Sequence, residues 1–237
     1  MKFAEPLAKG QLVRRYKRFM ADIITEEGEE LTLHCPNTGS MKNCLIEGAA
    51  VLYSDSHNPK RKLRYTWEAV QVAHGHWAGI NTHRANALVE EALTQGVMED
   101  YAGLEVHREV TWGDSCFDFA LGEKTDPTYL LEVKNVTLGP AATEADSGIM
   151  YFPDAVTTRG QKHLETLAEV VRQGGKAVLL YCVQHTGAKE VRPAEHIDPE
   201  YARLLRAAHE AGVVIKALKA HISPQEIQLA EEIPVVL

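Results

Sequence analysis

The chain has 237 residues, of which 45% are hydrophobic and 24% charged, and its formal net charge is −8. This composition is typical of a folded globular protein and excludes extended disorder and fibrous repeats. The sequence has no run of about 18 apolar residues and no apolar signal segment at its start, so we expect a cytoplasmic protein without membrane contacts. The length allows one large domain or two small ones.

The four cysteines show neither metal-ligand nor disulfide spacing. They are scattered along the chain, without a Cys-x-x-Cys pair or a Cys/His cluster. We therefore expect four buried free thiols, at positions Cys35, Cys44, Cys116 and Cys182.

Charge is distributed unevenly along the chain. Residues 1–80 carry 11 Lys and Arg against 9 Asp and Glu, a net charge of +2, whereas residues 81–237 carry 14 against 24, a net charge of −10. The basic residues of the first part form two clusters interleaved with aromatic residues, a composition suited to phosphates and stacked bases. The alternative is a solvated strand face whose aromatic residues point into the core. The candidate DNA-binding residues are Arg14, Arg15, Tyr16, Lys17, Arg18, Lys60, Arg61 and Lys62.

The first 80 residues have the pattern of strands separated by turns. No helical pattern interrupts them, and the turns contain Gly, Asn, Pro and Ser. Five short strands predict a small barrel or sandwich, and a five-stranded nucleic-acid-binding barrel fits this pattern. The predicted strands cover residues 12–25, 31–35, 49–55, 63–73 and 77–80.

After Asn81 the hydrophobic period becomes helical, with Thr82 as a candidate N-cap and Gly96 as the stop. The continuous apolar segment 177–183 is typical of a strand covered on both faces of an α/β sheet. The predicted order αβββαβαβ comprises a helix before Gly96, strands 104–112, 115–121 and 128–136, a helix at 161–173, strand 177–183, a helix at 199–211 and strand 213–218.

The connection 137–160 is long for a segment without regular structure. Such connections are often binding loops, and the alternative is a mobile surface insertion. Its end supplies an acid, hydroxyls and Arg159 just before a predicted helix. Because the N–H groups at the start of a helix favour anions, we expect a phosphate contact there.

Acidic and basic residues fall on two consecutive predicted strands. Asp118 lies between Phe117 and Phe119, so its carboxylate is expected on the face opposite both rings. The strand period places Glu132 and Lys134 on one face.

If these strands are neighbours, Asp118, Glu132 and the carbonyl of Val133 can bind Mg²⁺ or Mn²⁺. Lys134 would then orient water or stabilise negative charge, which is the chemistry of phosphodiester hydrolysis. The alternative is a set of cross-strand ion pairs on a solvated sheet.

The order of elements around Asp118 and Glu132-Val133-Lys134 resembles the PD-(D/E)xK nuclease superfamily. The whole chain resembles, more specifically, the sugar fermentation stimulation protein A family. The motifs that carry this resemblance are Arg-Tyr-Lys-Arg-Phe at 15–19, Leu-His-Cys-Pro-Asn-Thr-Gly at 33–39, Glu-Val-Lys-Asn-Val-Thr-Leu at 132–138 and Phe-Pro-Asp-Ala-Val-Thr at 152–157.

The resemblance implies an α/β (α+β) protein with a five-stranded OB-like barrel at residues 1–80 and a nuclease-like αβββαβ domain at 81–237. It implies a non-specific DNA-binding protein with a regulatory role in sugar (maltose) metabolism and a divalent-metal site. The alternative function is an Mg²⁺- or Mn²⁺-dependent nuclease with Lys134, Glu132 and Asp118 as catalytic residues. A helix-turn-helix reader is disfavoured because residues 213–218 are strand-like.

The resemblance also suggests residues on the two helices beside the sheet. An acid on the first helix often completes the metal site in the superfamily, and Glu91 is preferred over Glu90 for that role. Gln161 and His163 on the second helix could face the same site, with a plain surface role as the alternative for His163. One departure is Cys116, which stands where related sequences usually have Arg.

Overall fold

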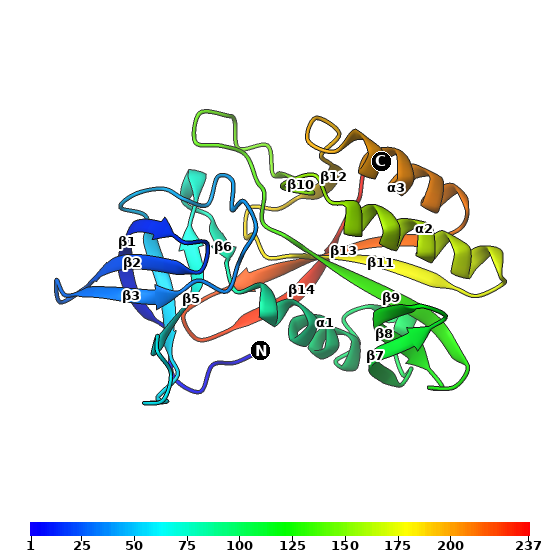
Figure 1. Ribbon diagram of the computed structural model, residues 1–237, viewed down its shortest axis with the longest axis horizontal. Coiled ribbons are helices and arrows are strands. Elements are labelled where there is room, and N and C mark those ends of the chain that lie inside the picture. Colours follow the sequence, from blue (N-terminus) through cyan, green and yellow to red (C-terminus); the bar gives the residue numbers. More distant parts are fainter.

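The computed structural model describes residues 1–237 and contains an N-terminal barrel beside an α/β domain (Figure 1). The barrel sheet has the strand order β3-β2-β1-β4-β5-β6, and a parallel contact between His34 of β3 and Thr66 of β5 closes β1 to β5 into a barrel. This confirms the predicted five-stranded barrel. The strands are β1 (Ala8–Tyr16), β2 (Met20–Thr25), β3 (Glu30–His34), β4 (Ala50–Asp55), β5 (Tyr65–Gln71) and β6 (Trp77–Gly79).

The single strand predicted for residues 12–25 is wrong, because β1 and β2 form a hairpin. Its turn places Lys17 and Arg18 at φ values of 49° and 63°, the left-handed region that glycine favours. No glycine or proline marks this turn in the sequence, so the pattern of turn residues did not predict it. The barrel core includes Leu12, Ile23 and Trp67, and strand β2 alternates buried and half-buried residues along its length.

The α/β domain has a central six-stranded sheet in the order β14-β13-β11-β9-β8-β7. Strand β11 is buried along its whole length and pairs in parallel with β9 and β13, as its continuous apolar sequence predicts. The strands are β7 (Val106–Trp112), β8 (Ser115–Gly122), β9 (Pro127–Val136), β11 (Ala177–Val183), β13 (Val214–Ile222) and β14 (Ile227–Ile233).

Helix α1 (Ala85–Thr94) covers one face of this sheet, while α2 (Thr158–Arg172) and α3 (Pro199–Glu210) cover the other. The order α1-β7-β8-β9-α2-β11 is the predicted αβββαβ core. The strand character of β13 also agrees with the sequence, which disfavoured a recognition helix there. No helix is long and apolar enough to cross a membrane.

Several details of this domain differ from the prediction. Asn81, not Thr82, caps the short 3₁₀ turn before α1 by accepting a hydrogen bond from the His83 N–H, while the Thr82 hydroxyl donates to the Pro36 carbonyl. The connection 137–160 contains β10 (Ile149–Phe152), which pairs in parallel with β12 (Glu190–Pro193). Strands β10, β12 and β14 are absent from the predicted order.

The cysteines also differ in one respect from the prediction. Cys35, Cys44 and Cys182 are buried free thiols, but Cys116 is exposed. Cys116 lies opposite Thr111 near the turn of the β7–β8 hairpin. The expectation of four buried thiols is therefore wrong at this position.

The two domains share part of one hydrophobic core. Leu7, Leu52 and Ala69 from the N-terminal part pack in the same cluster as Leu88 and Val89 of α1. Residues 1–7 also run beside the β13–β14 turn, where the Phe3 N–H donates to the Gln225 carbonyl. The barrel is thus fixed to the α1 side of the second domain.

Candidate metal and nucleic-acid site

The Asp118 carboxylate lies at the point where β8 and β9 separate. Their ladder ends at the pair Phe119–Leu131, and beyond it the Val133 N–H donates to Asp118 Oδ2 at 2.8 Å. The Asn86 side-chain amide of α1 donates to Asp118 Oδ1, also at 2.8 Å. Each carboxylate oxygen therefore has one fixed donor, which holds the group in place between the two strands.

The expectation that Phe117 and Phe119 share a face is wrong. Phe117 packs in the core under α2 and α3, whereas Phe119 packs in the core under α1. The β7–β8 register pairs Arg108 with Phe119 and Val110 with Phe117, and Glu109 between them has a φ of 53°. This irregularity in β7 accompanies a loss of simple alternation in β8.

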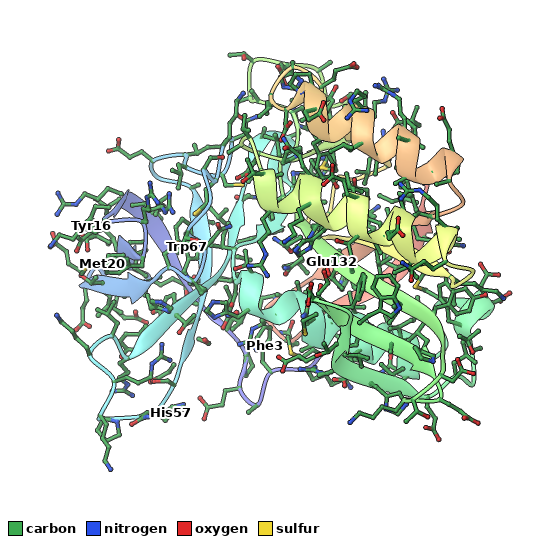
Figure 2. All side chains as sticks on the ribbon, turned by 45° about the vertical axis from the view of Figure 1, so that its right-hand side comes forward. Phe3, Tyr16, Met20, His57, Trp67 and Glu132 are labelled. Carbon is green, nitrogen blue, oxygen red and sulfur yellow. The ribbon has the colours of Figure 1, made fainter.

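Glu132 and Lys134 share a face, as predicted, and both contact His163 of α2. Lys134 Nζ donates to Glu132 Oε1 at 2.6 Å and lies 3.0 Å from His163 Nδ1. His163 Nδ1 is also hydrogen-bonded to Glu132 Oε1. Glu132 is only 5% exposed, so these contacts form in a largely dry environment beside α2 (Figure 2).

The contacts of Glu132 favour its ionised form. Burial by itself raises the pKa of Glu132, but the hydrogen bond from His163 and the charge of Lys134 outweigh burial and lower that pKa. Arg159 Nε donates to His163 Nε2 at 3.3 Å, which suits the tautomer that carries its proton on Nδ1 and donates it to Glu132. Arg159, in the first turn of α2, therefore contacts the ring that lies beside Glu132.

The donors of this site fit a hard divalent cation. Asp118, Glu132 and the Val133 carbonyl are all oxygen ligands, which Mg²⁺ and Mn²⁺ prefer. Lys134 and His163 both contact Glu132 on the same oxygen, Oε1. No three His, Cys, Asp or Glu side chains come together as a metal-binding group in the chain, so Asp118 does not complete such a group with Glu132 and His163, which contact each other.

The structure does not bring Glu91 to the other predicted ligands. Its carboxylate pairs with the Met1 ammonium, and Glu90 pairs with Arg108 of β7. The α1 residue beside Asp118 is Asn86, one turn before Glu90 on the same helix face. The sequence signal for Asn86 was a polar residue between the buried positions Ala85 and Leu88 at the start of an apolar helix.

Gln161 also has a different partner from the expected one. Its amide donates to both carboxylate oxygens of Asp198, at 2.9 and 3.1 Å. Asp198 is the N-cap of α3 and also accepts from the Thr157 N–H. Gln161 therefore joins α2 to α3 and is not placed beside Glu132.

The first basic cluster is partly used within the fold. Arg14 donates to Asp22 at 2.9 Å, and the Tyr16 hydroxyl donates to the same carboxylate. Lys17 and Arg18 are exposed at the hairpin turn. Figure 2 shows Tyr16 and Met20, on either side of this turn, well separated from Glu132.

Arg15 has a structural role in the same hairpin. Its guanidinium donates to the carbonyls of Arg18, Asn37 and Gly39 at 2.8 to 3.1 Å. The loop that it holds reaches the second domain, because the Ser40 hydroxyl donates to Asp154 at 2.8 Å. Arg15 is thus less available to a phosphate than Lys17 and Arg18.

The second basic cluster lies in the β4–β5 loop. Lys60, Arg61 and Lys62 are exposed there, and Arg61 contacts the Thr66 hydroxyl. Neither basic cluster contacts the Asp118–Glu132 site. The acidic residues Asp118 and Glu132 of the α/β domain are therefore separate from two groups of exposed cations on the barrel.

Comparison with known proteins identifies both halves of this architecture. Residues 13–80 match the model of the SfsA N-terminal OB domain, and residues 83–226 match the model of the sugar fermentation stimulation protein RE domain. The fold is therefore that of a protein with an OB barrel followed by an α/β domain. The chain belongs to the sugar fermentation stimulation protein (SfsA) family.

Curated relatives match over the full length of the chain. Sugar fermentation stimulation protein homologs from Alcanivorax borkumensis, Teredinibacter turnerae and Shewanella loihica are 56%, 51% and 50% identical, and each alignment covers 100% of both chains. A solved structure of Pyrococcus furiosus SfsA in complex with Ca²⁺ matches with a TM-score of 0.86 and 25% identity, and the match covers 100% of this chain and 98% of that chain.

Proposed function

We propose that this protein binds nucleic acid without sequence specificity and hydrolyses its phosphodiester bonds with Mg²⁺ or Mn²⁺. The observation that carries the proposal is the fixed arrangement of Asp118 between the separating strands and of Glu132, Lys134 and His163 beside it. Two carboxylates at a nucleic-acid surface repel phosphates unless a cation neutralises them. The Ca²⁺ bound by the Pyrococcus furiosus relative supports a divalent cation in this family.

In this proposal Asp118, Glu132 and the Val133 carbonyl hold the metal. A bound Mg²⁺ or Mn²⁺ supplies positive charge to the phosphodiester and lowers the pKa of water. Lys134 orients the attacking water or stabilises the negative charge that develops on the phosphate. His163 positions Glu132, and Arg159 lies where it can contact a phosphate while holding the His163 ring.

Binding in this proposal uses the exposed cations of the barrel. Lys17, Arg18, Lys60 and Lys62 make no ion pair within the chain, so their charges are available to phosphates. Exposed Phe19 lies beside Lys17 and Arg18, where its ring can stack on a base. Free thiols fit the reducing cytoplasm, where we place the protein.

The second candidate function is DNA binding without cleavage, with a regulatory role in sugar (maltose) metabolism. The family name supports the link to sugar use. The two-carboxylate site and the exposed thiol of Cys116, where related sequences usually have Arg, favour a weak or inactive centre. The same surfaces would then bind DNA, and any effect would follow from occupancy.

The test is cleavage of labelled single- and double-stranded DNA and RNA in Mg²⁺, Mn²⁺ or EDTA. We expect metal-dependent products from the wild type and from Lys162→Ala, which removes an exposed lysine next to His163 on α2. Asp118→Asn and Lys134→Ala should each reduce the rate by about 100-fold or more. If the wild type binds but cuts no substrate, the hydrolytic proposal is wrong and the binding function stands.

A further inference from the structure

A cavity of about 720 Å³ lies between the barrel and the start of α1. Its walls come from residues 2–8, the ends of β3 to β5, the β4–β5 loop and the turn before α1. Figure 2 shows two of its lining residues, Phe3 and His57, at the lower side of the barrel, away from Glu132. The Asp118–Glu132 site contributes no residue to this cavity.

The acidic residues that line the cavity have partners within the protein. Glu68 is fully buried, and Arg84 binds it through two hydrogen bonds of 2.6 and 2.7 Å. Asp55 pairs with Arg64, and Glu5 pairs with His57 at 3.1 Å. Glu68 and Asp55 are thus each neutralised by an arginine, whereas Glu5 is exposed and contacts only the His57 ring.

Besides Lys2, three basic groups in the same cavity have no acidic partner. Arg61 donates from two nitrogens to the neutral Thr66 hydroxyl, each at 3.3 Å, which leaves its remaining N–H groups free. His34 and His83 complete the group. Burial, followed by the charges of Arg61 and His83, lowers the pKa of His34, as expected for basic groups close to one another. An anion bound among them would offset this repulsion.

Aromatic residues form another part of the cavity wall. Tyr53 and Tyr65 meet edge to face with ring centroids 5.6 Å apart, and both line the cavity. The Phe3 ring lies beneath the Arg84 guanidinium, 5.0 Å from its centroid. Basic groups beside aromatic surfaces suit a ligand that has both a phosphate and a planar base.

We propose that this cavity binds a nucleotide phosphate, held by Arg61, His34 and His83, with the sugar or base against Tyr53 and Tyr65. The proposal rests on the nucleic-acid function proposed above and assigns a phosphate-anchoring site to it. His83 belongs to the turn immediately before α1, and Asn86, the partner of Asp118, follows three residues later. The phosphate site and the metal site are therefore joined by one short segment of backbone.

The test uses the full-length protein in EDTA, so that binding is measured without cleavage. Adenosine 5′-monophosphate, adenosine and inorganic phosphate are titrated by calorimetry, while the ring-nitrogen NMR signals of His34 and His83 are followed. We expect the monophosphate to bind and to shift both histidines, inorganic phosphate to bind more weakly and adenosine not to bind. Arg61→Gln should weaken monophosphate binding by about tenfold or more.

Lys9→Gln is the matched control, because it removes an exposed cation of β1 that does not line the cavity. Equal affinities for Arg61→Gln and Lys9→Gln, or equal binding of adenosine and its monophosphate, would overturn the assignment. Short DNA strands with and without a 5′-phosphate then show whether the bound phosphate is at a strand end or within the strand. If the strand without the 5′-phosphate binds more weakly, the site holds a strand end. If both strands bind equally and Arg61→Gln weakens the binding of both, the site holds an internal phosphate.

These outcomes separate the phosphate site from the proposed hydrolysis. If the protein cuts nucleic acid while Arg61→Gln binds the monophosphate like the wild type, the phosphate site is wrong and the hydrolytic function stands. If Arg61 is needed for monophosphate binding but no substrate is cut, the phosphate site stands and the hydrolytic function is wrong.

Discussion

Asn86 and Glu91 lie on the same helix, but only Asn86 contacts Asp118. The Asn86 amide donates to Asp118 Oδ1, whereas Glu91 pairs with the Met1 ammonium. Hydrogen bonds to a metal-ligating carboxylate orient it, and their loss commonly weakens metal binding 10- to 100-fold. Asn86 is therefore a positioning residue for the proposed metal site.

We expect Asn86→Ala to weaken Mn²⁺ binding by about tenfold, because Asp118 loses one of its two fixed donors. Glu91→Gln should change Mn²⁺ affinity by less than about twofold and act mainly on the packing of the N-terminal segment. Calorimetric titration with Mn²⁺ measures both. A large loss in Glu91→Gln with none in Asn86→Ala would return the metal-ligand role to Glu91.

The same residues show what the sequence predicts about a site. Glu132 and Lys134 are two apart in a regular strand, so the period of two correctly placed them on one face. Asp118 lies where β8 leaves its ladder with β9, and the period fails there. The metal-ligand role of Glu91 was predicted from the resemblance alone. Its partner in the structure is the Met1 ammonium, a contact that no local sequence pattern shows.

At the scale of elements, Asp198 links the starts of α2 and α3. It caps α3 through the Tyr201 N–H and accepts from the Thr157 N–H and the Gln161 amide, each at 2.9 Å. Burial by itself raises the pKa of Asp198, but these hydrogen bonds outweigh burial and lower that pKa. The ionised carboxylate therefore stabilises the folded state.

We expect Asp198→Ala to lower the free energy of unfolding by about 2 kcal/mol at pH 7. Because the folded pKa lies below the unfolded one, this stabilisation is present above the unfolded pKa and is lost as the pH falls through the folded pKa. The difference in free energy of unfolding between wild type and variant should thus shrink as the pH falls below about 4. Urea unfolding at several pH values measures this difference. Asp126→Ala, at an exposed position between β8 and β9, should show no such pH-dependent difference.

The basic residues of the β1–β2 hairpin have different roles: Arg15 stabilises the fold, and Lys17 and Arg18 are exposed. Arg15 holds the carbonyls of Arg18, Asn37 and Gly39, so Arg15→Ala should cost about 1 to 3 kcal/mol of stability. The double variant Lys17→Gln with Arg18→Gln should remain within about 0.5 kcal/mol of the wild type.

The same double variant should weaken DNA binding and reduce the slope of log affinity against log salt by about 1.5 to 2. Urea unfolding and fluorescence anisotropy over a salt series measure the two effects. An unchanged salt slope in the double variant would remove this hairpin from the DNA-binding surface. The hairpin thus separates a cation that stabilises the fold from cations that remain free for a ligand.

Elements were predictable where local pattern and tertiary pairing agree. The apolar run of β11 and the amphipathic patterns of α2 and α3 correctly predicted their type and position. Strand β10 has only four residues and lies in a connection with several Gly and Pro residues, and it is defined by its distant partner β12. Pairing between segments so far apart in the sequence leaves little local signal.

At the scale of the whole molecule, an ion pair with a fully buried carboxylate connects the two domains. Glu68 of β5 is fully buried and binds Arg84, which directly precedes α1, through two hydrogen bonds of 2.6 and 2.7 Å. The Asn81 amide and the Ser54 hydroxyl donate to the remaining acceptor positions of the same carboxylate. The barrel and the α/β domain are therefore coupled through a satisfied polar network as well as a shared apolar core.

We expect Arg84→Ala to lower the free energy of unfolding by about 3 to 5 kcal/mol, because it leaves the Glu68 charge buried without its cation. Arg206→Ala, which breaks the exposed pair with Glu195, should cost less than about 1 kcal/mol. Urea unfolding monitored by tryptophan fluorescence compares them, since Trp67 lies in the barrel core. Adding Glu68→Gln to Arg84→Ala should recover part of the loss, because the buried charge is removed. If Arg84→Ala costs no more than Arg206→Ala, the pair does not couple the domains, and the shared apolar core alone holds the barrel against α1.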